Sequence, residues 1–165
     1  YYVRTIGELW GIETVCLRSG RPTIHKQPVM TTHPPIIPYC FRQALDNGTI
    51  VIHGSGEQTR DYVFIEDVVD AMIAASAAEK INRLIINVGS GGETSVNEIV
   101  KTVIDTTSTQ PEIVINKSHD SGPSRMCADL SLAQKKLGYQ PKVSLKEGFQ
   151  RILERDIRFN KSSAI

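Results

Sequence analysis

The pattern of apolar and polar positions changes its period along the chain. Short apolar runs that suit buried strands occur at residues 14–17 and 84–88. Apolar residues recur at helical spacing over 36–47 and 66–79, where the sequence predicts amphipathic helices. Because strands and helices alternate in this order, we predict an α/β fold.

Local signals mark where several elements begin and end. Residues 1–10 are expected to be the end of a helix stopped by Gly11, and residues 19–34, rich in proline and polar side chains, a loop. Three serines are each followed three residues later by Glu or Gln, which is the spacing of a capping box at a helix start. These pairs are Ser95 with Glu98, Ser131 with Gln134, and Ser144 with Glu147.

Two strands are predicted on either side of a glycine-bearing turn. Residues 50–53 and 61–65 suit strands, and Gly54-Ser55-Gly56 lies between them, so we predict a hairpin-like unit. In the helix predicted next, larger side chains share one stripe and alanines lie between them, which indicates close packing on a sheet. The stripe comprises Val68, Val69, Met72, Ile73 and Ser76.

The composition excludes several classes of protein. One domain is expected for 165 residues, and a net charge of +1 is too small to hold nucleic acid or an acidic membrane by a general field. No apolar run approaches the roughly 18 residues that span a bilayer, and no signal peptide opens the chain, so we expect a soluble protein. Cys16, Cys40 and Cys127 are odd in number and lack ligand spacing, which predicts no disulfide framework and no metal site and favours the cytoplasm.

Common catalytic motifs are missing from these residues. The sequence has no G-x-x-x-x-G-K-[ST] loop, G-x-S-x-G elbow or H-E-x-x-H helix, which argues against P-loop nucleotide hydrolases, serine hydrolases and zinc proteases. Gly54-Ser55-Gly56 resembles part of a phosphate-binding loop, but a dinucleotide fingerprint needs a helix after the glycines and a strand is expected here. We therefore interpret this segment as a turn.

Two arginines stand where an anion could be bound. Arg60 lies between a glycine-bearing turn and a strand, and Arg125 precedes a predicted helix. Guanidinium groups suit a diphosphate because they donate two parallel hydrogen bonds. Either residue alone could instead be a surface arginine paired with a nearby Asp. The hypothesis of one site requires that the two guanidinium groups converge on a common pocket.

Several separated segments match one family in order and spacing. These segments are residues 52–71, 87–91, 122–133 and 137–148. They resemble the carboxy-terminal half of the extended short-chain dehydrogenase/reductase family, the NAD-dependent nucleotide-sugar epimerases and dehydratases such as the UDP-glucose 4-epimerases. The resemblance implies the substrate-binding part of a Rossmann-type α/β fold, with residues 1–34 as a remnant of the parallel cofactor-domain sheet and a connecting loop. Residues 35–160 would then form the nucleotide-sugar-binding domain.

The resemblance also implies roles for individual residues. Arg60 and Arg125 would clamp the diphosphate of a UDP- or dTDP-sugar. Pro38 and Phe41, on the predicted helix, would line the nucleotide base. His53 would join them there, although it suits equally well a polar residue of an edge strand.

The match fails where the family's chemistry is located. The family binds NAD through a glycine-rich turn after its first strand and moves a proton with a Tyr-x-x-x-Lys pair, and neither motif occurs in these residues. The family's Asn-Val-Tyr-Gly-Pro-Arg-Gln-like segment corresponds to residues 21–27, of which only the final basic residue and Gln27 are recognisable. We therefore expect NAD in the complete family enzyme but not on this chain alone, which we expect to be inactive and to hold no catalytic residue.

Two functions remain open. The chain is either the sugar-nucleotide-binding part of an enzyme that oxidises a sugar C4 hydroxyl with NAD and returns the hydride, or a non-catalytic sugar-nucleotide-binding or oligomerisation module of the same descent. In both, the expected ligand is a nucleoside-diphosphate sugar, without nucleic acid or membrane partners. The predicted strand at 14–17 would leave its edges open, so we expect a homo-oligomer or a partner chain.

Overall fold

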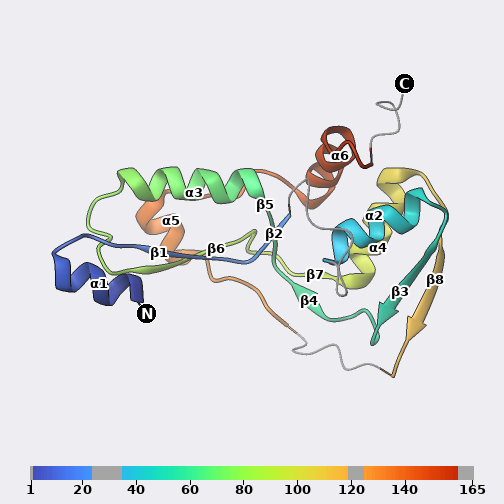
Figure 1. The fold of residues 1–165 in the computed structure, drawn as a ribbon, viewed down its shortest axis with the longest axis horizontal. Coiled ribbons are helices and arrows are strands. Elements are labelled where there is room, and N and C mark those ends of the chain that lie inside the picture. Colours follow the sequence, from blue (N-terminus) through green and yellow to red (C-terminus); the bar gives the residue numbers. More distant parts are fainter. Residues whose placement is uncertain (1, 24–34, 119–124, 160–165) are drawn as a thin grey trace.

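The computed structural model describes residues 2–23, 35–118 and 125–159, and within them helices and strands alternate (Figure 1). The predicted α/β class is therefore confirmed. In chain order the elements are α1 (Tyr2–Trp10), β1 (Cys16–Ser19), β2 (Arg21–Thr23), α2 (Ile36–Leu45), β3 (Thr49–His53), β4 (Thr59–Arg60), β5 (Tyr62–Phe64), α3 (Ile65–Ala77), β6 (Ile85–Val88), β7 (Thr94–Ser95), α4 (Val96–Thr107), β8 (Glu112–Asn116), α5 (Ser131–Leu137) and α6 (Leu145–Arg155).

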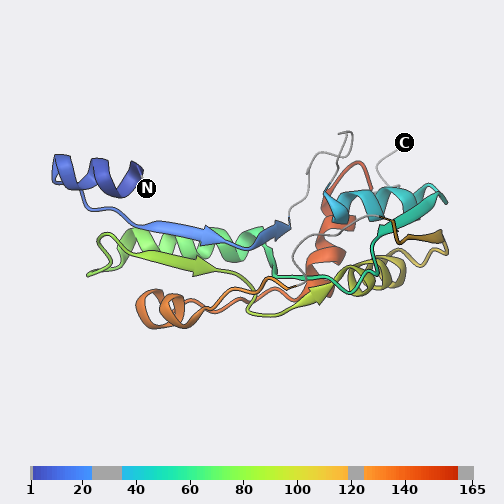
Figure 2. The same ribbon diagram turned by 90° about the horizontal axis from the view of Figure 1, so that it is seen from below.

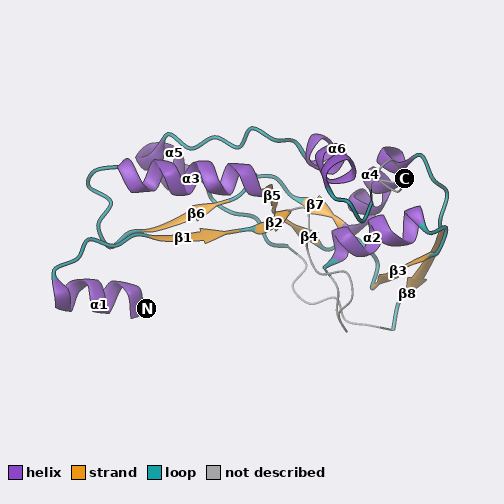
Figure 3. Cartoon of the chain, turned by 45° about the horizontal axis from the view of Figure 1, so that its top comes forward, coloured by secondary structure: helices purple, strands orange, loops and turns teal. Residues whose placement is uncertain are grey.

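The strands pair two by two along an elongated molecule. β1 pairs with β6, β2 with β5 and β3 with β8, all parallel, whereas β4 and β7 are antiparallel. Figures 1 and 3 show β1 and β6 at one end beside α3 and α5, and β3 and β8 at the other end beside α2 and α4. The shorter pairs lie between them, and Figure 2 shows the same order from below. The β1–β6 pair is parallel, as expected for part of a parallel sheet, but β6 lies outside the predicted 1–34 remnant.

Two hydrophobic cores hold the two ends. The first core lies between α2, α4, α6 and the strands β3 and β5, and Phe41 is fully buried in it. Its ring lies 5.4 Å from that of Phe149 and 5.5 Å from that of Phe159, centroid to centroid. The second core joins α3, β6 and α5, and Val15 and Leu17 pack against it. Residues on both sides of the predicted 34/35 boundary share this second core, so the domain boundary stays a prediction.

The predicted loop at residues 19–34 contains a strand, so this prediction was wrong in its first part. In β2 the Arg21 amide donates to the carbonyl of Asp61 at 2.8 Å, and the Thr23 hydroxyl donates to the carbonyl of Val63 at 3.3 Å. The proline and polar content that indicated a loop is compatible with a short strand, because β2 is three residues long and Pro22 lies at its centre. Residues 24–34 lie outside the described residues.

The hairpin-like unit was also predicted wrongly. β3 pairs with β8 and β5 pairs with β2, so the two predicted strands do not pair with each other. The turn between them docks on the start of α4, where the Asn97 amide donates to the carbonyl of Gly56 at 3.1 Å. Gly56 has a φ of +77°, and a Cβ there would lie 2.1 Å from Oδ1 of Asn97, so only glycine fits.

Helix α3 buries a different face from the one predicted, and of the predicted stripe Val68 alone packs against the second core. The larger side chains Val69, Met72 and Ile73 are exposed, whereas Ala71 and Ala75 are buried. Small residues allow the helix axis to approach β6 and α5 closely, and this close packing decides the orientation of the helix. The sequence pattern alone ranked the faces by side-chain size and therefore selected the wrong one.

The three predicted capping boxes had different outcomes. At α4 the box is complete, since the Glu98 amide donates to Oγ of Ser95 at 3.1 Å and the Ser95 amide donates to the Glu98 carboxylate at 2.7 Å. At α6 the serine accepts from the amide three residues on. At α5 the prediction was wrong, because Ser131 is the first helical residue and its amide and hydroxyl donate to Asp129.

The orientation of α3 predicts the effect of two substitutions on stability. Ala71→Leu should lower the free energy of unfolding by about 1–3 kcal/mol, because a larger side chain is forced into a filled core. Met72→Ala, at the neighbouring exposed position, should change it by less than about 0.5 kcal/mol. Urea denaturation followed by circular dichroism measures both, and a larger loss for Met72→Ala would mean that the predicted stripe is buried after all.

Candidate functional site

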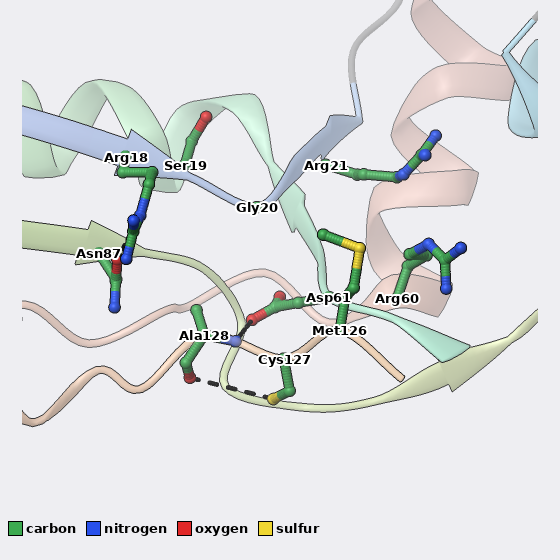
Figure 4. Close-up of a pocket in the computed structure, with 10 residues that line it drawn as sticks. All are labelled: Arg18, Ser19, Gly20, Arg21, Arg60, Asp61, Asn87, Met126, Cys127 and Ala128. Carbon is green, nitrogen blue, oxygen red and sulfur yellow. Dashed lines mark hydrogen bonds between the residues drawn. The ribbon is translucent and has the colours of Figure 1, made fainter. Parts of the chain in front are cut away.

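A cavity of about 440 Å³ lies where the carboxyl ends of β1 and β6 meet the junction of β4 with β5 (Figure 4). In parallel α/β sheets this edge is where ligands bind. The volume lies within the range of small-molecule sites. The lining residues are Arg18, Ser19, Gly20, Arg21, Arg60, Asp61, Asn87, Met126, Cys127 and Ala128.

Asp61 connects the three segments that enclose this cavity. Its carboxylate accepts hydrogen bonds from the Ser90 amide at 2.7 Å, the Ser90 hydroxyl at 2.7 Å, the Gly91 amide at 3.2 Å and the Ala128 amide at 3.2 Å. Its carbonyl accepts from the Arg21 amide at 2.8 Å. The side chain is 4% exposed, so its charge is satisfied by these donors and is directed at the protein backbone.

Two glycines allow this close approach to Asp61. A Cβ at Gly20 would lie 2.8 Å from the carbonyl oxygen of Asp61, and a Cβ at Gly89 would lie 2.4 Å from its Oδ2. Neither position accepts a side chain without displacing the residue that connects the cavity walls. The carbonyl of Gly89 also accepts a hydrogen bond from the Tyr139 hydroxyl at 2.8 Å, which fixes the same segment from behind.

Arg60 reaches the cavity from a buried position. It is 9% exposed, and its Nη1 donates to the carbonyl of Thr59 at 2.6 Å, which orients the guanidinium group. Arg60 also lines a second cavity of about 230 Å³, together with Arg21 and Tyr62. Burial raises the pKa of Tyr62, and the positive charges of Arg21 and Arg60 oppose that shift. The guanidinium groups of Arg21 and Arg60 therefore both lie close enough to Tyr62 to affect its pKa.

The structure separates the residues that were predicted to line a nucleotide base. His53, exposed at the end of β3, lines the second cavity with Arg60 and Gln58. The side-chain Nε2 of Gln58 donates to the carbonyl of His53 at 3.1 Å. Pro38 and Phe41 are both buried, Phe41 in the first core, and α2 presents Ile36 to the cavity in their place. Contact of Pro38 and Phe41 with a base stays a prediction without direct geometric support.

Arg125 lies beside the cavity but its guanidinium group turns to Glu93. Nε of Arg125 donates to the two Glu93 oxygens at 3.0 and 2.8 Å, and Nη2 pairs with the same carboxylate. Glu93 also accepts from the Thr59 hydroxyl at 2.9 Å, so it links Arg125 to the strand that carries Arg60. The hydrogen bonds from Arg125 and Thr59 lower the pKa of Glu93 to about 2. The two predicted clamp arginines are therefore near each other, but only Arg60 lines the cavity.

The sequence interpretation missed two residues of the site. Arg21 was assigned to a loop, yet it opens β2 and lines the first two cavities and a third of about 240 Å³. Asp61 stood within the matching segment but carried no signal for its role, because its partners are 29 and 67 residues away. The sequence offered one signal for Arg21: it is a basic residue that follows Gly20 shortly after a predicted strand.

The two glycine-bearing turns in the described part of the chain do not fit the pyrophosphate of a dinucleotide. The Gly54-Ser55-Gly56 turn leads from β3 to β4 and not to a helix start, and Asn97 occupies the space that Gly56 leaves. The turn after β6 cannot donate to a phosphate either, since its backbone amides at Ser90 and Gly91 already donate to the Asp61 carboxylate. These turns therefore offer no phosphate cradle of the kind that holds a cofactor pyrophosphate.

Other kinds of site find no support in residues 2–23, 35–118 and 125–159. No group of three or more His, Cys, Asp or Glu side chains is placed to hold a metal ion there. No helix in that part is long and apolar enough to cross a membrane. Desolvation and the charges of Asp61 and Glu93 raise the pKa of Cys127, which favours the protonated thiol over the thiolate.

The fold defines an α/β protein of the extended Rossmann type, with a candidate ligand site at the carboxyl ends of parallel strands. The model of the family described as GDP-mannose 4,6 dehydratase matches residues 2–152. The chain therefore belongs to this family, within the extended short-chain dehydrogenase/reductases that include NAD-dependent nucleotide-sugar epimerases. The resemblance seen in the sequence is confirmed.

Known proteins of this kind match the chain over about half of their own length. A putative UDP-glucose 4-epimerase of Methanocaldococcus jannaschii is 30% identical over 152 residues, which are 92% of this chain and 48% of that protein. The UDP-glucose 4-epimerase of Thermotoga maritima, solved with UDP-glucose, superposes with a TM-score of 0.85 at 27% identity, over 93% of this chain and 48% of that one. The UDP-glucuronic acid 4-epimerase of Bacillus cereus, in complex with UDP-glucuronic acid and NAD, gives 0.78 at 26% identity, over 88% and 46%.

Replacement of Asp61 tests its role in holding the cavity together. Asp61→Asn turns an amide group toward backbone donors and should lower the free energy of unfolding by about 1–3 kcal/mol. Asp46→Asn is the control, because Asp46 is exposed and makes a single 3.6 Å ion pair, worth less than about 1 kcal/mol. Equal losses for the two variants in chemical denaturation would contradict the role assigned to Asp61.

The ion pair of Glu93 with Arg125 gives a pH prediction. Because the folded-state pKa of Glu93 is lowered to about 2, its stabilising contribution is present above its ordinary value of 4.5 and is lost as the pH falls toward 2. Carboxyl-carbon NMR should therefore place the Glu93 midpoint well below 4.5 and move it upward in Arg125→Gln. An unchanged midpoint in that variant would mean that the pair does not form in solution.

Proposed function

We propose that this chain is the nucleotide-sugar-binding part of an NAD-dependent epimerase or dehydratase that acts on a UDP- or dTDP-sugar. The single observation that carries the proposal is the arginine-lined cavity, in which Arg60 is buried and oriented while the carboxylate of Asp61 is engaged by backbone amides. The wall of the cavity that faces a ligand is therefore positive. Solved relatives that contain UDP-glucose or UDP-glucuronic acid support the same ligand class.

The geometry suggests how such a ligand would be held. The guanidinium group of Arg60 stands between the 440 Å³ cavity and the 230 Å³ cavity that His53 lines. A diphosphate at Arg60 would direct the nucleoside toward the smaller cavity and the sugar toward Asn87 and Met126 in the larger one. Partial burial strengthens the charge-assisted hydrogen bonds that Arg60 would donate.

The chemical steps require groups that these residues do not supply. NAD would provide the hydride acceptor in the complete family enzyme, and the two glycine-bearing turns of this chain do not fit it. A tyrosine that transfers a proton needs a lowered pKa, whereas burial raises the pKa of both Tyr62 and Tyr139. We therefore propose that the 165 residues alone bind the sugar nucleotide and do not convert it.

The second candidate function is a binding or oligomerisation module without catalysis. The observation in its favour is the absence of a Tyr-x-x-x-Lys pair from the sequence given. The protein that carries this chain decides between the two: turnover of a UDP-sugar with bound NAD supports the enzyme. Tight UDP-sugar binding without turnover or NAD binding supports the module.

We also propose that the apolar face of α1 is covered by a second copy or by another chain. Tyr2, Leu9 and Trp10 are 76–80% exposed, and such side chains on one short helix favour association. Sedimentation-velocity measurements across a concentration series test this proposal. A single monomeric species at all concentrations would contradict it.

The proposed location is the cytoplasm. It rests on the odd number of cysteines, which gives no disulfide framework of the kind that secreted domains use. Measurement of the free thiols of the protein isolated from its own cell tests it, with three reduced cysteines expected.

The ligand class is tested by calorimetry with UDP-glucose, glucose and Arg60 variants. The protein should bind UDP-glucose and not glucose, and Arg60→Lys should weaken binding by about 1.5–3 kcal/mol because lysine cannot donate the two-pronged pair. Arg42→Lys is the control, because Arg42 lies exposed on α2 and away from the cavities. Equal affinity for glucose and UDP-glucose, or an Arg60→Lys variant that binds normally, would rule against the diphosphate site.

A further inference from the structure

The side chains of Arg21 and Arg60 project from the same face of the short central strands. Arg60 lies two residues before Tyr62, and Arg21 is the strand partner of Tyr62 in the β2–β5 pair. Residues in either relation lie on one face of a pleated sheet. All three side chains accordingly line the 230 Å³ cavity, and both arginines also line the 440 Å³ cavity. Figure 4 shows the two guanidinium groups at one end of that larger cavity and Arg18 with Asn87 at the other.

These two cations have little acidic charge around them. Asp61 is the only acidic residue among the described residues that line the three cavities, of about 440, 230 and 240 Å³. Its carboxylate accepts hydrogen bonds from backbone amides of residues 90, 91 and 128, so it is not directed at the guanidinium groups. Two like charges repel each other, and more strongly where protein partly replaces water. An anion bound between Arg21 and Arg60 would offset that repulsion.

The backbone of Arg21 is fixed, so the base of its side chain has a defined position. Its amide donates to the carbonyl of Asp61 at 2.8 Å. A Cβ at Gly20, the preceding residue, would lie 2.8 Å from the same oxygen, so the two segments are in close contact there. Beyond its backbone, Arg21 makes no ion pair or hydrogen bond with the described residues. Its guanidinium group therefore keeps its donors for a ligand.

Arg125, the other arginine that the sequence suggested, is engaged outside the cavity. Its Nε donates to the two Glu93 oxygens at 3.0 and 2.8 Å, and its side chain is 76% exposed. Glu93 is itself held by the Thr59 hydroxyl at 2.9 Å. A ligand that recruited Arg125 would first have to break these charge-assisted hydrogen bonds, whereas Arg21 has none to lose.

We propose that Arg21, together with Arg60, binds the diphosphate of the nucleotide sugar, and that Arg21 takes the role that the sequence resemblance assigns to Arg125. The inference rests on the proposed function, since it needs a diphosphate in this cavity. Each of the two phosphate groups carries a negative charge, and each guanidinium group can donate two parallel hydrogen bonds to one of them. The Glu93–Arg125 pair is then a structural link beside the site and does not contact the ligand.

The experiment is calorimetry with UDP and UDP-glucose on the purified protein that carries this sequence. Arg21→Gln should weaken the binding of both about tenfold or more, the loss expected for one charged hydrogen-bonded pair. Arg21→Lys keeps the charge without the two-pronged geometry, and its affinity should lie between the two. The control is the double variant Glu93→Gln with Arg125→Gln, which removes the whole ion pair at constant net charge. It should bind both ligands within about twofold of unmodified protein.

The variants also show which result would overturn the role of Arg21. Tenfold weaker binding in the double variant with normal binding in Arg21→Gln would return the role to Arg125. Equal losses in the two would mean that Arg125 leaves Glu93 to bind the ligand, which also contradicts the proposal. Because Arg21 is exposed, Arg21→Gln should unfold at the same temperature as unmodified protein, so its lost affinity reports a lost contact. Failure of the proposed function looks different: unmodified protein then binds neither UDP nor UDP-glucose.

Discussion

The arrangement of the site depends on the carboxylate of Asp61. This one buried side chain receives hydrogen bonds from residues 90, 91 and 128, and its backbone binds residue 21, so four segments distant in sequence meet at one point. Because its charge is satisfied by backbone donors, a carboxylate in the cavity does not neutralise the arginines around it. Asp61 thus joins the walls of the cavity without cancelling the positive charge of the arginines that line it.

The parts of the fold that the sequence predicted are those determined by local interactions. The α4 cap depends on residues three apart, and it was predicted correctly. The hairpin prediction was wrong because Thr49 pairs with Glu112, and no local pattern indicates a partner at that separation. For α3, the periodicity was correct, but the buried face was decided by how closely the helix packs on β6 and α5, which side-chain hydrophobicity does not reveal.

The site was predicted only in part, because the sequence shows local signals but not long-range contacts. Arg60 could be proposed because a turn and a strand flank it, and the structure places it on the cavity wall. Arg125 was proposed with it, but Glu93 accepts its guanidinium group across 32 residues of sequence. Arg21 was overlooked because strand β2 exists only through its pairing with β5. Long-range pairing thus created the part of the site that the sequence did not predict.

The cavity lies between two separately packed cores, and this has a mechanical consequence. Arg18 and Asn87 belong to the β1–β6 end, whereas Arg60 lies on a strand beside the end that contains α2, α4 and α6. A ligand that touched both sides would add a direct connection between two cores that share no buried residue. Its binding would therefore stabilise the folded protein at both ends at once.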